Sequence, residues 1–214
     1  MKQLTILFII SLLFTACKKE ESEGRFYASY TATVTFYWNS TDFPTSYPAN
    51  AHFSKLIGWS HGPNDTLMKR GTYATTGIKD MAERGQTSPL DNEIEEMGYT
   101  PVIGESLSTG TGELSIDIDV SIDHPRISLC TMVAPSPDWY VAAVSVNLFE
   151  NELFVDKKTV NAYVYDAGTD DGTTFTSANS VSTPPQPITL FVDTPLGNGV
   201  TVKPVFAKVT FTKL

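Results

Sequence analysis

Two acidic segments contain the side chains best suited to chemistry in this sequence. Asp138 follows a turn rich in proline, and Asp166 and Asp170 lie on either side of Gly168. Each segment adjoins an apolar, strand-like run, so a β-fold could bring the two together. Clustered carboxylates repel one another unless a cation lies between them, and oxygen ligands on glycine-containing loops suit Ca²⁺. We therefore expect Asp138, Asp166 and Asp170 to bind Ca²⁺, with backbone carbonyl groups and water completing the coordination.

An EF-hand is excluded as the form of this site. Counted from Asp166, glycine falls at the seventh place instead of the sixth, and Ser177 occupies the twelfth place, where an EF-hand has glutamate. The ligands would instead come from separate loops at one end of a β-fold. Asp and Gly are also common in ordinary turns, so turns without a metal remain the alternative on spacing alone.

The first 16 residues have the features of a targeting segment. Lys2 supplies a positive charge, and the run from Leu4 to Phe14 is almost wholly apolar but too short to span a bilayer as a stable helix. Small residues precede Cys17, which resembles a bacterial lipoprotein signal whose cysteine is acylated. We expect residues 1–16 to be a lipoprotein signal peptide and Cys17 to be the lipid attachment site. An ordinary secretory signal that contains a cysteine is the alternative.

Residues 17–25 are expected to comprise the lipidated Cys17 and a disordered tether, because the segment from Lys18 to Gly24 is too polar to bury. A multiply acylated cysteine holds a protein firmly on a membrane, since each buried methylene contributes about 0.8 kcal/mol. Lysine followed by acidic residues at this place is similar to the signal that sends some lipoproteins to the outer cell surface. We expect an outer-membrane lipoprotein. Two interpretations of the segment after Cys17 remain open: a signal for display on the cell surface, or a plain solvated linker.

The charge balance and the cysteines exclude further classes of protein. Without its signal peptide the chain has 14 basic and 24 acidic residues, a formal charge of −10. Nucleic acid is excluded as a partner because phosphate binding needs clustered Lys and Arg. Cys130 lies in an apolar run and has no second cysteine to pair with if Cys17 is lipidated. We expect a buried, unreactive thiol and a domain without disulfides.

Alternation with a period of two dominates residues 26–214 and predicts β-strands. Apolar residues occupy the even positions from Phe26 to Trp38, and Ile116, Ile118 and Val120 alternate with polar residues in the same way. Further strands are expected at residues 127–133, 140–148, 153–155, 160–165, 188–192 and 205–211, with a turn at residues 197–199.

One region has helical spacing instead. Between Gly71 and Gly98 the apolar residues predict two short helices in a long connection between strands. No repeat, linker or break in charge divides residues 26–214, so we assign one all-β domain, an antiparallel sandwich in preference to a barrel. The apolar positions of the two helices are Ile78, Met81 and Ala82, followed by Leu90, Ile94 and Met97.

Four ordered segments resemble the spondin N-terminal domain, the module of F-spondin and mindin. They are residues 50–58, 77–90, 123–139 and 166–170, and the resemblance covers about residues 27–213. It implies a C2-like antiparallel β-sandwich with Ca²⁺ at one edge, and the family's metal-binding aspartates fall on Asp138, Asp166 and Asp170. Tyr165 stands where the animal proteins usually have Trp, and the extra cysteines of the animal domain are missing.

Two functions from different classes follow from these observations. The first is a membrane-anchored, non-enzymatic module for extracellular adhesion or recognition, with an unknown extracellular protein or glycan as its partner. The alternative is a surface hydrolase acting on glycans with a structural or catalytic metal. We expect no enzyme, because no nucleophile, base or acid pair has a recognisable spacing, and Asp117 and Asp119 alternate onto a solvent face. A third interpretation is that the protein is a structural subunit of an envelope complex.

Overall fold

The computed structural model describes residues 26–65 and 67–214. The expected signal peptide (residues 1–16), Cys17 and the tether (residues 17–25) lie outside the described residues. Among the helices of the described ranges, none is long and apolar enough to cross a membrane.

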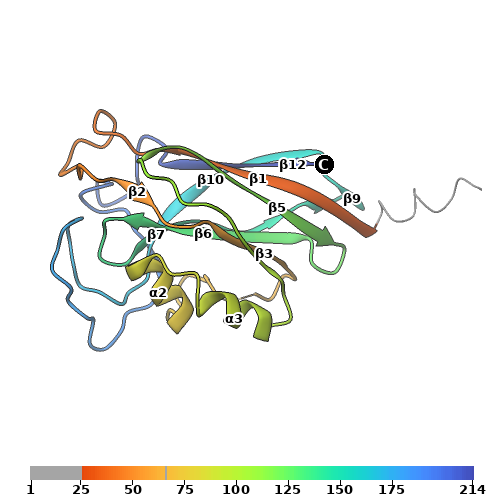
Figure 1. The fold of residues 1–214 in the computed structure, drawn as a ribbon, viewed down its shortest axis with the longest axis horizontal. Coiled ribbons are helices and arrows are strands. Elements are labelled where there is room, and N and C mark those ends of the chain that lie inside the picture. The colour runs from red at the N-terminus through yellow and green to blue at the C-terminus, as the bar shows by residue number, and fades with distance from the viewer. Residues whose placement is uncertain (1–25, 66) are drawn as a thin grey trace, which may run out of the picture.

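One antiparallel sheet of ten strands forms most of the domain, in the order β4-β3-β6-β7-β10-β12-β1-β5, with β11 added to β10 and β2 added to β6. It folds back on itself into two layers (Figure 1). This confirms the expected all-β antiparallel fold. The strands are β1 (Tyr27–Tyr37), β2 (His52–Phe53), β3 (Ile57–His61), β4 (Pro101–Ile103), β5 (Thr111–Ser121), β6 (Arg126–Ala134), β7 (Trp139–Asn147), β10 (Lys157–Asp166), β11 (Thr189–Leu190) and β12 (Ala207–Lys213), and β8 (Phe149–Glu150) pairs with β9 (Leu153–Phe154) in a separate hairpin.

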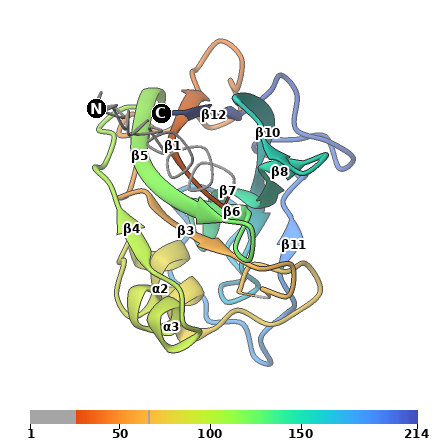
Figure 2. The ribbon, with the colours of Figure 1, turned by 90° about the vertical axis from the view of Figure 1, so that its right-hand side faces the viewer.

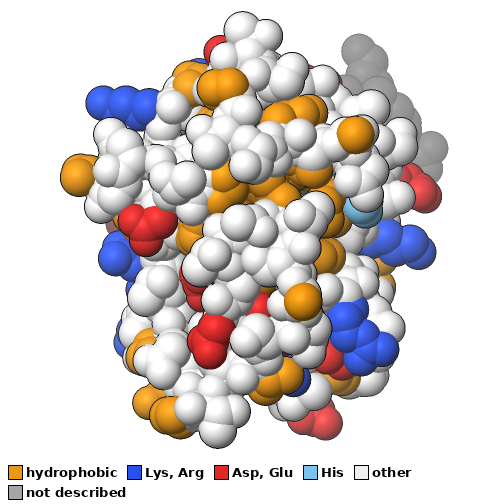
Figure 3. All heavy atoms as spheres, turned by 90° about the vertical axis from the view of Figure 1, so that its left-hand side faces the viewer, with side chains coloured by type: hydrophobic (Ala, Val, Ile, Leu, Met, Phe, Trp, Pro, Cys, Tyr) orange, Lys and Arg blue, Asp and Glu red, His pale blue; other side chains and the backbone are white. Residues whose placement is uncertain are grey.

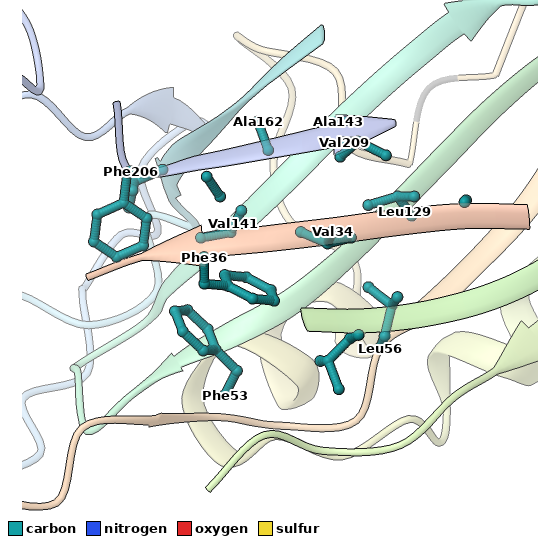
Figure 4. Close-up of a cluster of buried hydrophobic side chains, with 14 of the residues drawn as sticks. Val34, Phe36, Phe53, Leu56, Leu129, Val141, Ala143, Ala162, Phe206 and Val209 are labelled. Carbon is teal, nitrogen blue, oxygen red and sulfur yellow. The ribbon is translucent and has the colours of Figure 1, made fainter. Parts of the chain in front are cut away.

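The main core lies between the two layers. In β1 and β5 every second side chain is buried, as the alternation predicted. In Figure 4, Val34 and Phe36 of β1 lie against side chains from the opposite layer, and the rings of Phe36 and Phe53 are stacked with centroids 3.9 Å apart. Burial of these side chains stabilises the sandwich by about 25 cal/mol for each square ångström of apolar surface removed from water.

The lower layer is buried on both faces, because the two helices cover its outer side (Figure 1). Helix α2 (Thr76–Arg84) and helix α3 (Leu90–Glu96) place Ile78, Met81 and Leu90 in a second apolar cluster with Cys130 of β6. The two predicted helices and the buried thiol are confirmed, whereas Met97 is exposed just beyond the end of α3. Burial raises the pKa of the Cys130 thiol, which keeps it protonated and unreactive.

The two ends of the sheet approach each other, so that the sandwich is nearly closed. Figure 2 views the strands end-on, with β4 and β5 on the same side of the molecule. Gly58 of β3 allows this approach, because a Cβ there would lie 2.7 Å from Ile116 Cδ1 of β5. Strands β2, β3, β4 and β8 were not predicted, and the strand expected at residues 188–192 is reduced to β11. We call the end where β1 begins the N-terminal end and the opposite end the far end.

Gly77→Ala should destabilise the domain by about 1–3 kcal/mol, because overpacking forces neighbouring atoms apart. A Cβ at Gly77 would lie 2.5 Å from the Leu90 Cα and 2.5 Å from Glu93 Oε2, so α2 and α3 would have to separate. Gly62→Ala is the matched control, because the nearest atom to its Cβ is 3.5 Å away. Denaturant unfolding measures both variants. Equal stability of the two would contradict the close packing of the helices.

Candidate metal centre

The fold brings the three predicted aspartates to one corner of the far end. Asp138 lies in the turn between β6 and β7, Asp166 is the last residue of β10, and Asp170 follows in the next loop. Strands β7 and β10 are neighbours, and Trp139 pairs with Asp166 in their ladder. Because β7 and β10 are adjacent and antiparallel, the start of β7 and the end of β10 lie at the same end of the sheet. The two acidic segments, which are distant in sequence, therefore meet there.

Asp138 is fully buried and is the centre of this corner. The backbone N–H groups of Thr169 and Asp170 donate to its Oδ2 at 2.7 and 3.1 Å, and the Thr169 hydroxyl donates to the same oxygen at 3.2 Å. Within the described part of the chain, Oδ1 of Asp138 is buried and has no hydrogen-bond partner. An unpaired buried polar atom is costly, so this oxygen has an unused capacity to accept a hydrogen bond or bind a cation.

The other two carboxylates shape the loop that follows β10. Asp166 Oδ1 accepts a hydrogen bond from the N–H of Gly168 at 2.7 Å. Asp170 accepts from the N–H of Gly172 at 2.7 Å through Oδ1 and from the N–H of Ser180 at 2.9 Å through Oδ2. These contacts are the local turns that Asp side chains favour. The corner therefore has a defined geometry made by its own backbone amides.

Burial and mutual repulsion disfavour full ionisation of this corner. Burial, followed by the neighbouring Asp166, raises the pKa of Asp138 to about 7, although the hydrogen bonds from Thr169 and Asp170 act in the opposite direction. Burial also raises the pKa of Asp166. A divalent cation between two such carboxylates would offset both the repulsion and the loss of hydration.

The residues present fit a hard cation such as Ca²⁺. The carboxylate oxygens of Asp138, Asp166 and Asp170 are ligands of the kind that Ca²⁺ prefers, and one of them is buried and unpaired. Among the residues that the structure describes, no group of three or more His, Cys, Asp or Glu side chains, Asp138, Asp166 and Asp170 included, is placed so that it could hold a metal ion by itself. Backbone carbonyl groups and water would therefore have to supply the remaining ligands.

A cavity of about 400 Å³ adjoins the corner, and its lining includes Asp166, Asp170, Asp171 and Ser182 together with Asp193 from the loop after β11. Sequence reasoning did not include Asp193, because only the folded loops bring it beside the acidic segment. In Figure 3 the far end is seen from outside, with acidic side chains scattered among mostly uncharged atoms and Lys and Arg side chains at its two sides. The cavity gives solvent access to part of the corner.

The aromatic residues near the corner belong to the core. Trp139 and Tyr140 are fully buried and Tyr165 is nearly so. Trp139 stacks on Phe191 with ring centroids 4.0 Å apart, and Tyr140 stacks on Tyr165 at 5.4 Å. Their role is packing, so they offer no surface to a glycan or peptide.

A buried Ser-His-Asp group at the N-terminal end was not recognised in the sequence, where its His and Ser lie 67 residues apart. His61 Nδ1 donates to the Gly62 carbonyl at 2.6 Å, so Nε2 accepts from the Ser128 hydroxyl at 2.8 Å. The distance from Nδ1 to Asp65 Oδ2 is 3.9 Å. Ser128 Oγ also accepts from the Ser145 N–H at 2.9 Å. Because His61 and Ser128 are buried and hydrogen-bonded, and burial lowers the pKa of His61, this group stabilises the fold.

The remaining polar candidates are also structural. His52 Nδ1 is 2.7 Å from the Asn50 carbonyl oxygen. Asp117 and Asp119 are exposed and accept hydrogen bonds from Thr31 and Ser29 of the neighbouring strand at 2.7 and 2.5 Å. The interpretation of this carboxylate pair as a solvent face is confirmed.

A nearly closed antiparallel sandwich with an acidic corner defines the structural class, and comparison with known proteins gives the family. The family model Spondin_N matches residues 28–195. Human Spondin-2 is 33% identical over 175 residues, which cover 78% of this chain and 53% of Spondin-2. Bovine Spondin-1 is 33% identical over 168 residues, which cover 72% of this chain and 21% of Spondin-1. The chain belongs to the spondin N-terminal domain family, and it spans about half the length of Spondin-2.

The metal-free protein should lose stability as the pH rises from about 4 through about 7. The folded protein holds a proton on Asp138 that an exposed carboxyl of the unfolded chain has already released. This contribution, on the order of 4 kcal/mol, is fully present below about pH 4 and is lost as the pH rises through the folded pKa. Thermal melts in EDTA should show a falling Tm across this range.

Asp138→Asn should flatten this dependence on pH, and the exposed Asp117→Asn should leave it unchanged. A wild-type Tm that rises steadily with pH in EDTA would contradict the assignment of a protonated Asp138.

Proposed function

We propose that this chain is a membrane-anchored, Ca²⁺-binding domain for extracellular recognition or adhesion that catalyses no reaction. The observation that carries the proposal is the buried, unpaired Oδ1 of Asp138 beside Asp166. It supports a cation at the joint between the β6–β7 turn and the loop after β10. Membership of the spondin family supports a recognition domain as the functional class.

In this proposal Ca²⁺ acts by ordering the loop between β10 and β11. That loop is already tied to itself, since the N–H of Gln186 donates to the Gly168 carbonyl at 2.7 Å and the N–H of Ser182 to the Thr169 carbonyl at 3.0 Å. Because Asp138 holds the start of the loop, a cation there would stiffen the whole segment. Loops on a rigid scaffold usually carry recognition, and this loop presents the exposed Val181.

The partner that we propose is an extracellular protein or glycan that contacts the loops of the far end. The cavity beside the corner offers the carboxylates of Asp171 and Asp193 and the side chain of Gln186 as hydrogen-bonding groups. Nucleic acid is not proposed, in view of the acidic charge of the chain. Attachment to the outer membrane through Cys17 rests on the lipoprotein signal that ends at Ala16.

A hydrolase is the less favoured function. Within residues 26–65 and 67–214, the Ser128 hydroxyl is the one side-chain hydroxyl that is hydrogen-bonded to a histidine ring, yet it is 2% exposed and already accepts a backbone hydrogen bond. A nucleophile must reach a substrate carbonyl, and an oxygen enclosed in this way does not. Recognition therefore explains the arrangement better than catalysis.

Ca²⁺ should raise the melting temperature of residues 26–214 selectively over Mg²⁺. A ligand that binds only the folded state at 100 times its Kd stabilises that state by about 2.7 kcal/mol, or roughly 5–10 °C for a domain of this size. Asp138→Ala, Asp166→Ala and Asp170→Ala should abolish the rise. The exposed Asp119→Ala is the control and should retain it. A rise that survives in Asp166→Ala, or that is lost equally in Asp119→Ala, would show that the metal site lies elsewhere.

Ser128→Ala should lower stability by about 1–3 kcal/mol, because the buried His61 Nε2 and the Ser145 N–H both lose their partner. On panels of glycan and ester substrates, the wild-type protein and the variant should both show background turnover only. Turnover that depends on Ser128 and His61 would establish the hydrolase and refute the non-enzymatic function.

A further inference from the structure

Large apolar side chains are exposed at the N-terminal end of the sandwich. They come from segments that are distant in sequence: the start of β1, the residue after β5, the β8–β9 hairpin and the end of the chain. In Figure 1 the hairpin and the C-terminus lie at the same end of the molecule as the start of β1, and Figure 2 shows the hairpin across that end from β5. Tyr27 and Leu153 are 65% and 66% exposed. We name this set the N-terminal apolar patch, and it consists of Phe26, Tyr27, Ile122, Leu153 and Leu214.

Backbone hydrogen bonds fix the position of most of this patch. The N–H of Ile122 donates to the Phe26 carbonyl at 3.1 Å, and the N–H of Leu214 donates to the Ser29 carbonyl at 2.9 Å. The N–H of Lys213 donates to the Asp156 carbonyl at 2.9 Å, which holds the end of β12 beside the segment that follows β9. The patch is therefore part of the rigid sandwich, although its side chains are exposed to water.

The length of the chain before Phe26 identifies what could cover the patch. Phe26 is nine residues after Cys17, and even fully extended this stretch reaches at most about 32 Å. The far end lies a further strand length away, about 36 Å for the 11 residues of β1. With Cys17 in a bilayer, the N-terminal end is thus the nearest part of the domain to the lipid. The short connection gives this end a high effective concentration at the membrane surface.

The chemistry of this end suits the interfacial region of a bilayer. Aromatic side chains such as Phe26 and Tyr27 favour the level of the headgroups, and apolar residues insert just below it. The nearby lysines pair with carboxylates, Lys158 with Glu150 and Lys213 with Asp156 at 3.4 Å. The exposed carboxylates of Asp123 and Glu152 beside the patch add negative charge that anionic lipid would repel, so apolar insertion into a zwitterionic surface is the mode of contact that fits.

We propose that the N-terminal apolar patch docks on the lipid surface to which Cys17 is attached. The sandwich then stands on its N-terminal end, with the acidic corner about one strand length from the membrane. This inference rests on the proposed lipid anchor and adds an orientation to it.

The test uses the full lipidated chain in liposomes of phosphatidylcholine and phosphatidylethanolamine. An environment-sensitive fluorophore is attached to a new thiol at Leu153→Cys, or at Val200→Cys as the matched control, an exposed apolar position at the far end. Cys130 is buried and Cys17 is acylated, so neither competes for the label. The label at 153 should shift to the blue and be quenched by lipids with spin-labelled headgroups. The label at 200 should remain quenched by aqueous iodide.

Further variants separate the docking from the anchor. With the label at 153, the double substitution Phe26→Ser and Tyr27→Ser should reverse most of the blue shift, and Val200→Ser should not. Flotation with liposomes reports the anchor, and Cys17→Ser should abolish it. If the protein floats but iodide quenches the label at 153 as strongly as the label at 200, the docking is overturned and the anchor is not. Failure of the wild-type protein to float would overturn the anchor and the docking together, and a blue shift that requires anionic lipid would contradict apolar insertion.

Discussion

The buried carboxylate of Asp138 is the contact on which the far end of the molecule depends. One of its oxygens receives three hydrogen bonds from Thr169 and Asp170, and through them it joins the β6–β7 turn to a loop that has little regular structure of its own. The same burial that makes these bonds strong makes the charge costly. Ionisation of Asp138 beside Asp166 is therefore unfavourable in the folded domain, and a proton on Asp138 lowers this electrostatic cost.

The rest of the domain provides a rigid frame for this corner. The nearly closed sheet has one core between its layers and a second beneath α2 and α3, so β6 is buried on both faces. A strand held from both sides cannot shift its register without exposing apolar side chains. Asp138 directly precedes β7, the neighbour of β6, and Asp166 ends β10, which pairs with β7. The ladder between β7 and β10 thereby fixes the two aspartates relative to each other.

Much of this structure could be predicted from the sequence, because period-two alternation in β1 and β5 and helical spacing around Ile78 and Leu90 are local signals. The short strands β2 and β4 carry no such signal, since their pairing depends on the partner and not on their own pattern. At the corner, sequence could name the three aspartates. It could not show that Asp138 is fully buried or that one oxygen lacks a partner, because both follow from packing by residues far along the chain.

Among the strands of the described ranges, β5 is paired with one neighbour, β1. An edge strand of 11 residues is long enough to pair with the same strand of another copy. The carboxylates of Asp117 and Asp119, held upright by Thr31 and Ser29, form a row of like charge along that strand. Two copies that met through β5 would bring these rows together, and their repulsion opposes growth of a continuous intermolecular sheet. The hydroxyl–carboxylate ladder between β1 and β5 thus opposes edge-to-edge pairing of two copies of the domain.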